Sequence, residues 1–345
     1  MNTVWNKQSI VGQAPMDGVT DAAFRYISDV HGMPDLLFTE FVPVEGIARS
    51  AVRVLQSFVH HKTETPTLAQ IYGRNLDAFY LSAFVAAELG YDGIDINMGC
   101  PDRAVTKRGA GAGLIKAPSH AKKIIKTVQQ AVKDWSQGKT MVEAGVPEDI
   151  MKQVAYMQNV YQVKGDRSHI PVSVKTRIGY DKVVTTEWIK YLTEAKPAAI
   201  SLHGRTLEQM YTGKADWDEI GKAAEVTHGA GILLLGNGDI SSVPDAREKI
   251  KTYNLDGALI GRATFGNPWI FKEIEADTQL RIKTALEHAE VFEKLLPDGH
   301  FLSLRKHMAW YIKGFDHSAA LRDKLMRLQS IEDVREILTP YLREE

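Results

Sequence analysis

The stretch GILLLGNGDISSVPDAREKIKTYNLDGALIGRAT, residues 231–264, has two short apolar runs with a helix-like segment between them. The runs at 231–239 and 256–264 predict strands that are apolar on both faces, which is typical of strands buried in a parallel sheet. The segment at 243–254 predicts an amphipathic helix. Because a helix between two parallel strands is the repeating unit of α/β folds, this stretch indicates that fold class.

The same alternation continues along most of the chain. Further strands are predicted at 9–16, 36–41, 67–73, 93–100, 171–179 and 198–206, and further helices at 75–90, where Asn75 can cap the first turn, and at 185–197. About eight strand–helix units in roughly 270 residues are what a TIM (β/α)8 barrel requires. The alternative, a doubly wound open sheet, needs a G-x-G-x-x-G turn after its first strand, where this chain has APMDGVTD at 14–21. We therefore predict the barrel.

The strand pattern divides the chain into two parts. Residues 1–275 predict the barrel domain; its two helices at 118–135 and 147–163 exceed what one barrel unit needs, so part of 136–168 is expected to be an insertion. Residues 276–345 predict a small helical domain. Its stretch 301–330 has a local excess of basic residues, with Lys or Arg at 305, 306, 313, 322, 324 and 327 against Asp316 and Asp323.

Composition limits the class of protein. The 345 residues carry a formal net charge of −1, so any contact with nucleic acid must come from a local patch such as 301–330. One cysteine cannot form an intrachain disulfide. No apolar run approaches the roughly 18 residues of a membrane span, and the N-terminus has no signal-peptide pattern. These features predict a cytoplasmic enzyme without a membrane partner, and the lack of a coiled-coil pattern favours a monomer.

Candidate site residues, most of them polar, follow almost every predicted strand, where the active site of a TIM barrel lies. They are Pro15, Met16 and Asp17; Glu40; Gln70; Asn97 and Cys100; Lys175 and Arg177; His203 and Arg205; Asn237, Gly238 and Asp239; and Gly261 and Arg262. We therefore expect these residues to meet at one end of the barrel.

Cys100 is the single cysteine and lies in a Gly-Cys-Pro turn after the strand at 93–100. An inert buried thiol is one interpretation. The other is a reactive group at the barrel mouth, whose pKa the following Lys107 and Arg108 would lower. The glycine-rich KRGAGAGLIK at 107–116 lacks the Walker and Rossmann spacings, and we interpret it as a mobile lid beside this cysteine.

Lys175 and His203 are two further candidates for chemistry. By strand alternation Lys175 shares a face with Ser173 and Arg177, where a buried ammonium needs an acceptor or an anionic partner such as Asp95. Lys175 could instead form a Schiff base or lie beside an electron-rich cofactor. His203 is either a hydrogen-bonded structural imidazole or a site residue, and no second His or Cys at ligand spacing indicates a metal site.

Glycines end both strands of the stretch 231–264, in GNGD (236–239) and IGRAT (260–264). The loops after the seventh and eighth strands form the usual phosphate cradle of TIM barrels, so the two turns predict a phosphorylated ligand. From the residues alone, a Schiff-base aldolase and a flavin oxidoreductase both remain open.

Taken together, these motifs resemble those of the tRNA-dihydrouridine synthases, a family of flavin enzymes. The matching pieces are APMDGVTDAAFR (14–25), TEFV (39–42), QIYG (70–73), DINMGCPDRAVTKRGAGAGLIKAP (95–118), VSVKTRIGYD (172–181), ISLHGRTLEQMYTGKADW (200–217), LLGNGDI (234–240), DGALIGRATFGNPWIF (256–271) and LRKHMAWYIKG (304–314). They occur in order over nearly the whole chain, and the segment at about 136–168 is the departure from the family pattern.

The resemblance implies a flavin-dependent oxidoreductase acting on a CH–CH bond. The reaction would be reduction of the C5–C6 double bond of uridines in tRNA, with FMN as cofactor and NADPH as reductant. Cys100 would donate a proton to C5, and Lys175 and His203 would lie by the flavin as catalytic groups. The implied cofactor contacts are Pro15, Met16, Asp17, Gln70, Lys175, His203, Asn237, Gly238, Asp239, Gly261 and Arg262. The implied substrate contacts are Asn97, Arg177, Arg305 and Lys306, and no metal is implied.

Three other functions remain as alternatives. An FMN barrel that reduces a free pyrimidine or another small molecule would not need the helical domain, so deletion of 276–345 should leave its turnover intact. A degenerate barrel that only binds tRNA would not need Cys100 and Lys175. A Schiff-base lyase would be trapped by borohydride at Lys175.

Overall fold

The computed structural model describes residues 4–210, 212–297, 301–313 and 318–342. Its parallel strands run in the order β1-β9-β8-β7-β6-β5-β4-β2. Their bounds are β1 Ile10–Gln13, β2 Leu37–Phe38, β4 Thr67–Tyr72, β5 Gly93–Met98, β6 Val172–Gly179, β7 Ala199–Thr206, β8 Leu233–Asn237 and β9 Gly257–Ile260. A two-residue strand, β3 (Val42–Pro43), adds to β4.

Backbone hydrogen bonds between the two ends of this order close the sheet. The Gln13 N–H donates to the carbonyl of Leu36 at 2.9 Å, and the Asp35 N–H donates to the carbonyl of Val11 at 3.0 Å. These bonds join β1 to the residues just before β2. The sheet is therefore an eight-stranded TIM barrel, as predicted, with each predicted strand present.

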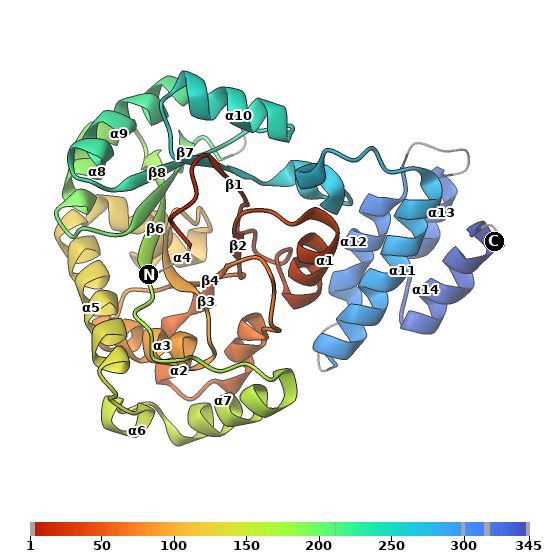
Figure 1. Cartoon of the computed structure of the whole chain (residues 1–345), viewed down its shortest axis with the longest axis horizontal. Helices are drawn as coiled ribbons and strands as arrows, with labels where there is room; N and C mark the ends of the chain where they lie inside the picture. Colours follow the sequence, from red (N-terminus) through yellow and green to blue (C-terminus); the bar gives the residue numbers. More distant parts are fainter. Residues whose placement is uncertain (1–3, 211, 298–300, 314–317, 343–345) are drawn as a thin grey trace.

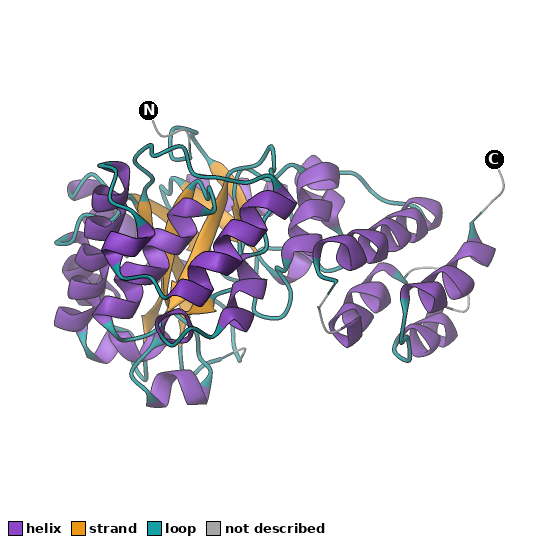
Figure 2. Ribbon diagram, turned by 90° about the horizontal axis from the view of Figure 1, so that it is seen from below, coloured by secondary structure: helices purple, strands orange, loops and turns teal. Residues whose placement is uncertain are grey.

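Helices surround the barrel, as Figure 2 shows. The larger ones are α1 Ala22–Gly32, α3 Leu76–Glu88, α5 Pro118–Ser136, α7 Glu148–Tyr161, α8 Thr185–Thr193, α9 Trp217–Gly229 and α10 Val243–Thr252. Shorter segments are α2 Val44–Ala48, α4 Arg103–Lys107, α6 Met141–Ala144, η1 Val52–Phe58, η2 Gly111–Lys116, η3 Arg262–Thr264 and η4 Pro268–Lys272. Sequence analysis missed α1 and α9, although Asp21 and Asp216 cap them by accepting from the third residue after the cap.

The barrel interior changes from apolar to polar along the strands. Its apolar cluster contains Val4, Ile10, Ala14, Leu36, Phe38, Leu68, Ala199, Leu235 and Leu259. Buried polar side chains, among them Gln70, Asp95, Ser173 and Ser201, alternate with outward-facing apolar residues that pack under the helices. Hydrophobic burial therefore holds the barrel together, while its carboxyl end is left polar.

The segment 136–168 contains α6 and α7. Helix α7 lies against η1 and α3, and buries Ile150, Val154 and Met157. On its other face Tyr156 is 55% exposed. That this segment is an insertion relative to other barrels stays a prediction.

The C-terminal part is helical and projects from one side of the barrel (Figure 1). It contains α11 Thr278–Leu295, η5 Phe301–Ser303, α12 Leu304–Tyr311, α13 Ser318–Leu325, α14 Ile331–Leu338 and η6 Thr339–Tyr341. Helix α11 packs directly on α1. Deleting 276–345 would uncover apolar surface of α1, so the deletion test from the sequence would disturb the barrel itself. Asp316, counted in the basic stretch, lies outside the described residues.

Two histidines are fully buried where α1 meets α11 and α12. The rings of His288 and His307 lie with centroids 5.0 Å apart, and His288 Nδ1 is 3.0 Å from the hydroxyl of Tyr311. Burial lowers the pKa of His288 to about 3 and holds the pKa of His307 well below its usual value. Both imidazoles are therefore neutral in the native protein.

Acid should weaken this domain contact, and His288→Phe should make the protein less sensitive to acid. The unfolded imidazole binds a proton near pH 6.5 and the native one near pH 3, so wild-type stability falls as the pH drops below 6.5. Relative to wild type, the variant should gain unfolding free energy at a rate that approaches about 1.4 kcal/mol per pH unit, or roughly 2 kcal/mol in total between pH 6.5 and 4.5. Urea unfolding at both pH values measures this. If the unfolding free energy of both proteins fell by the same amount between the two pH values, the prediction would be wrong. The cost of losing the Tyr311 contact does not alter this conclusion.

Candidate active site

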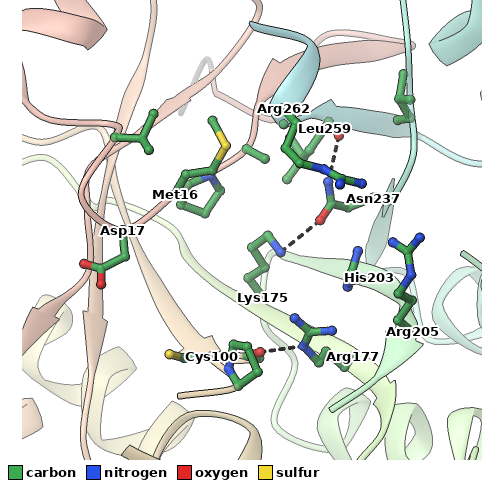
Figure 3. A pocket seen from close by; sticks show the side chains of 18 of the residues that line it. Met16, Asp17, Cys100, Lys175, Arg177, His203, Arg205, Asn237, Leu259 and Arg262 are labelled. Atoms are coloured by element: carbon green, nitrogen blue, oxygen red, sulfur yellow. Dashed lines mark hydrogen bonds between the residues drawn. The ribbon is translucent and has the colours of Figure 1, made fainter. Parts of the chain in front are cut away.

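A pocket of about 920 Å³ opens at the carboxyl end of the barrel (Figure 3). Most of the predicted site residues line it: Pro15, Met16, Asp17, Asn97, Cys100, Lys175, Arg177, His203, Asn237, Gly238, Asp239, Gly261 and Arg262. They follow β1, or lie on or just after β5, β6, β7, β8 and β9. The pocket is large enough for a cofactor together with part of a second ligand.

Cys100 lies in the pocket wall, 7% exposed, in the turn after β5. The Asn97 Oδ1 accepts from the backbone N–H groups of Gly99 at 3.0 Å and Cys100 at 2.8 Å. Burial raises the pKa of the Cys100 thiol; Asp17 and Asp102 raise it further, against Arg177. The thiol is therefore neutral at physiological pH, the state that a proton donor needs.

The prediction that Lys107 and Arg108 lower the pKa of this thiol is wrong. Burial raises the pKa of the thiol, and the cation that lowers it is Arg177 on β6. The predicted lid segment, 107–116, packs beside the cysteine, since the Ala112 N–H donates to the Cys100 carbonyl at 3.1 Å. Its mobility stays a prediction.

Lys175 extends from β6 into the pocket, and its Nζ donates to Asn237 Oδ1 at 3.1 Å. The Asn237 amide is fixed because its Nδ2 donates to the Leu259 carbonyl at 2.8 Å. The acceptor that Lys175 requires is thus Asn237, while Asp95 acts on it only through its charge. Burial, followed by the charge of Arg177, lowers the pKa of Lys175 to about 8.

His203 extends from β7 beside Lys175 in the same pocket (Figure 3). Burial holds the pKa of His203 well below its usual value, and the charges of Arg177 and Lys175 lower it further. The imidazole is therefore neutral, so it can donate one hydrogen bond and accept another.

Two arginines and one carboxylate form the end of the pocket beyond β8. The Asp239 Oδ2 accepts from Arg205 at 2.6 Å, and its Oδ1 accepts from Arg262 at 3.0 Å. The side chain of Arg205 is 3% exposed. Arg205 was expected at this end of the barrel from its position two residues after His203 on the same strand face, but no role in the site was predicted for it.

The glycine turns after β8 and β9 bring the backbone to the pocket surface. Gly238 has a φ of +131°, and a Cβ there would lie 2.6 Å from that of Ala215. At Gly261 a Cβ would make ordinary van der Waals contacts, with Met16 Sδ at 3.7 Å and Ala14 Cβ at 3.9 Å. Only glycine keeps both surfaces free for a ligand that approaches the backbone closely.

Four predicted residues do not line the pocket: Glu40, Gln70, Arg305 and Lys306. Gln70 is fully buried beneath it, with both ends of its amide hydrogen-bonded to other side chains. In α12, Arg305 donates through Nε to the Leu328 carbonyl at 2.8 Å. Lys306 reaches the loop after β1, where a Cβ on Gly18 would lie 3.0 Å from its Nζ.

Phe265 is a pocket residue that sequence analysis missed. It stacks on Trp310 of α12, with ring centroids 4.0 Å apart and an interplanar angle of 8°. The helical domain therefore contacts the pocket wall. Phe265 lies five residues past β9, beyond the strand-end residues from which the site was predicted.

No group of three or more His, Cys, Asp or Glu side chains in the described ranges could hold a metal ion. None of the helices described is both long and apolar enough to cross a lipid bilayer.

Comparisons with known proteins agree with one another. Residues 12–162 and 145–344 match the family model described as dihydrouridine synthase (Dus). The chain is 34% identical over 339 residues to a "Probable tRNA-dihydrouridine synthase" of Staphylococcus epidermidis, covering 95% of this chain and 92% of that protein. It is 29% identical over 360 residues to the "Probable tRNA-dihydrouridine synthase 1" of Synechocystis sp., covering 97% and 90%. This chain belongs to the dihydrouridine synthase family.

Proposed function

We propose that this protein is an FMN-dependent tRNA-dihydrouridine synthase, which reduces the C5–C6 double bond of uridines in tRNA with NADPH as reductant. The observation that carries the proposal is a neutral, buried thiol, Cys100, in one pocket with Lys175 and His203. The names of the similar Staphylococcus and Synechocystis proteins support tRNA as the substrate.

The pocket residues fit FMN. Arg262 and the backbone at Gly238 and Gly261 would hold the phosphate, because the glycine turns leave room for it and guanidinium pairs well with phosphate. Pro15, Met16 and Leu259 form an apolar wall for a flat ring. Lys175 would lie by the electron-rich edge of that ring. When bound and reduced, FMN would supply the hydride that adds to C6 of the uracil.

Cys100 would supply the proton that completes the reduction. Addition of a hydride at C6 leaves negative charge at C5 and O4, and transfer of the thiol proton to C5 quenches it. Arg177 favours the thiolate that results, because its charge lowers the pKa of the thiol. Asn97 and Arg177 are the proposed uracil contacts.

A uridine in folded tRNA must leave its stack to reach the pocket. Arg305 and Lys306 of α12 are the proposed contacts to the tRNA backbone. Of the two, Lys306 lies closer to the pocket, beside the loop that contains Asp17 and Gly18. We propose that α12 guides the nucleotide across this loop.

The direct test is the dihydrouridine content of unmodified tRNA after incubation with the protein, FMN and NADPH, measured by mass spectrometry of nucleosides. Dihydrouridine at defined positions is the expected result. A protein that binds FMN and oxidises NADPH but forms none would favour the alternative, a flavin barrel that reduces a free pyrimidine or another small molecule.

Arg262→Ala should weaken FMN binding by roughly 10- to 100-fold, the loss expected for a hydrogen bond between charged groups. Quenching of flavin fluorescence on titration of the apoprotein measures the Kd. Arg247→Ala is the matched control, because Arg247 is exposed and pairs with Glu273 outside the pocket. Equal Kd values for wild type and Arg262→Ala would remove this arginine from the proposed phosphate site.

A further inference from the structure

A line of hydrogen bonds runs beneath the pocket from the carboxylate of Asp95 to the turn that contains Cys100. The Gln70 Nε2 donates to Asp95 Oδ2 at 2.6 Å, and the Asn97 Nδ2 donates to Gln70 Oε1 at 2.9 Å. The Asn97 Oδ1 then accepts from the backbone N–H of Cys100 at 2.8 Å and of Gly99 at 3.0 Å. Every side chain in this line comes from the neighbouring strands β4 and β5.

Asp95 determines which way the amide groups of Gln70 and Asn97 point. An ionised carboxylate can only accept, so the amide nitrogen of Gln70 must face it and the amide oxygen must face Asn97. Asn97 must then turn its nitrogen to Gln70 and its oxygen to the Cys100 turn. If both amides were reversed, the nitrogen of Asn97 would meet the backbone N–H groups, and donor would face donor.

Asp95 lies inside the barrel, where both of its carboxylate oxygens accept hydrogen bonds. It is fully buried, and Ser173 Oγ donates to its second oxygen at 2.6 Å. Burial raises the pKa of Asp95 to about 6, against the hydrogen bonds from Ser173 and Gln70. Among the described residues no cation forms an ion pair with this carboxylate, so its two closest partners are neutral donors.

We propose that Asp95 is a positioning residue for the proton donor: acting through Gln70 and Asn97, it fixes the turn that sets where the Cys100 thiol faces the pocket. The proposal rests on the role proposed above for Cys100. It also gives a role to Gln70, which does not line the pocket, and gives Asn97 a second role besides its proposed contact with the uracil.

The reactivity of Cys100 tests the proposal without any assay of tRNA. Because Cys100 is the single cysteine, iodoacetamide reports on this site alone. Asp95→Leu removes the acceptor while approximating the volume, and the freed turn should expose the thiol, so labelling of the purified holoenzyme should become about fivefold faster or more. Asp95→Asn keeps one acceptor oxygen for Gln70, and its labelling rate should stay within about twofold of wild type.

Two further variants guard against a general loss of structure. Asp92→Leu removes a hydrogen bond of similar kind, from the Thr67 N–H at 2.8 Å, at the opposite end of β5. When each protein is measured the same number of degrees below its own Tm, Asp92→Leu should be labelled at the wild-type rate. Gln70→Met breaks the line one link later and should label like Asp95→Leu, so it carries the test if Asp95→Leu does not fold.

The flavin half-reactions separate this role from an effect on Lys175. The half-reactions are compared at about pH 6, well below the pKa of Lys175, so that the ammonium stays protonated without the charge of Asp95. Asp95→Leu should then slow reoxidation of the reduced flavin by tRNA by roughly 10- to 100-fold, the cost of a misplaced reacting group, and leave flavin reduction by NADPH unchanged. Wild-type labelling in both Asp95→Leu and Gln70→Met would overturn the proposal. So would Asp95→Asn or Asp92→Leu labelling as fast as Asp95→Leu, or a loss confined to flavin reduction. If wild type forms no dihydrouridine, the labelling result still stands, so the two proposals fail separately.

Discussion

Cys100→Ala is expected to slow dihydrouridine formation by about 10²- to 10⁴-fold, the range that a positioned general acid contributes. The thiol lies in the pocket wall, and burial keeps it protonated. Alanine leaves the volume nearly unchanged but has no proton to give. Flavin reduction by NADPH should continue at the wild-type rate, because it needs no proton at uracil C5. Stopped-flow absorbance of the flavin, first with NADPH and then with tRNA, measures the two steps separately.

Cys100→Ser is the companion variant. A hydroxyl has the shape of the thiol but is a far weaker acid, so its rate should lie close to that of alanine rather than wild type. If Cys100→Ala reduced tRNA at the wild-type rate, Cys100 would not be the donor. Asp17 and Asp102, which also line the pocket, would then be the next candidates.

Strand alternation located most of the pocket because it is a local property of the backbone. Arg177 and His203 are register partners on β6 and β7, and Lys175 lies two residues before Arg177 on the same face. Because consecutive side chains of a strand point to opposite faces, the shared direction of Lys175 and Arg177 follows from counting residues. The turns at Gly238 and Gly261 were found in the same way, as glycines at strand ends.

What the sequence did not predict depends on residues that are far apart along the chain. The closure of the barrel rests on backbone bonds between Gln13 and Leu36, and two-residue strands such as β3 are too short to show a period. The pKa shift of Cys100 was predicted in the wrong direction, because Lys107 and Arg108 are near it in sequence while burial, a tertiary property, raises the pKa.

The contact of the helical domain with the pocket could not be predicted from the sequence either. Lys306 was expected from its charge to contact the tRNA backbone, and the structure adds that it reaches the loop at Gly18. The stack of Phe265 on Trp310 joins residues separated by 45 positions, and no periodicity connects them.

Lys175→Met is expected to slow flavin reduction by NADPH by roughly 10²- to 10³-fold, the loss seen when one donor to a developing negative charge is removed. The proposed role of Lys175 is to face the edge of the flavin where charge collects on reduction. Methionine has a similar length without the charge, and it also frees the acceptor Asn237 Oδ1. The rate of flavin bleaching in anaerobic stopped flow measures the effect, and FMN content controls for loss of the cofactor. A wild-type rate in a variant that retains FMN would exclude this role.

The pH dependence adds a second signature of Lys175. With a pKa lowered to about 8, the ammonium loses its proton as the pH rises through that value. The wild-type kcat/KM for NADPH should therefore fall above pH 8, since this ratio follows ionisations of the free enzyme. Lys175→Arg keeps its charge over the whole range, so its profile should stay level where the wild-type profile falls, and Lys175→Met should be low and level. If kcat/KM for NADPH also fell near pH 8 in both variants, the ionisation would belong to another group. That result would exclude the proposed electrostatic role of Lys175.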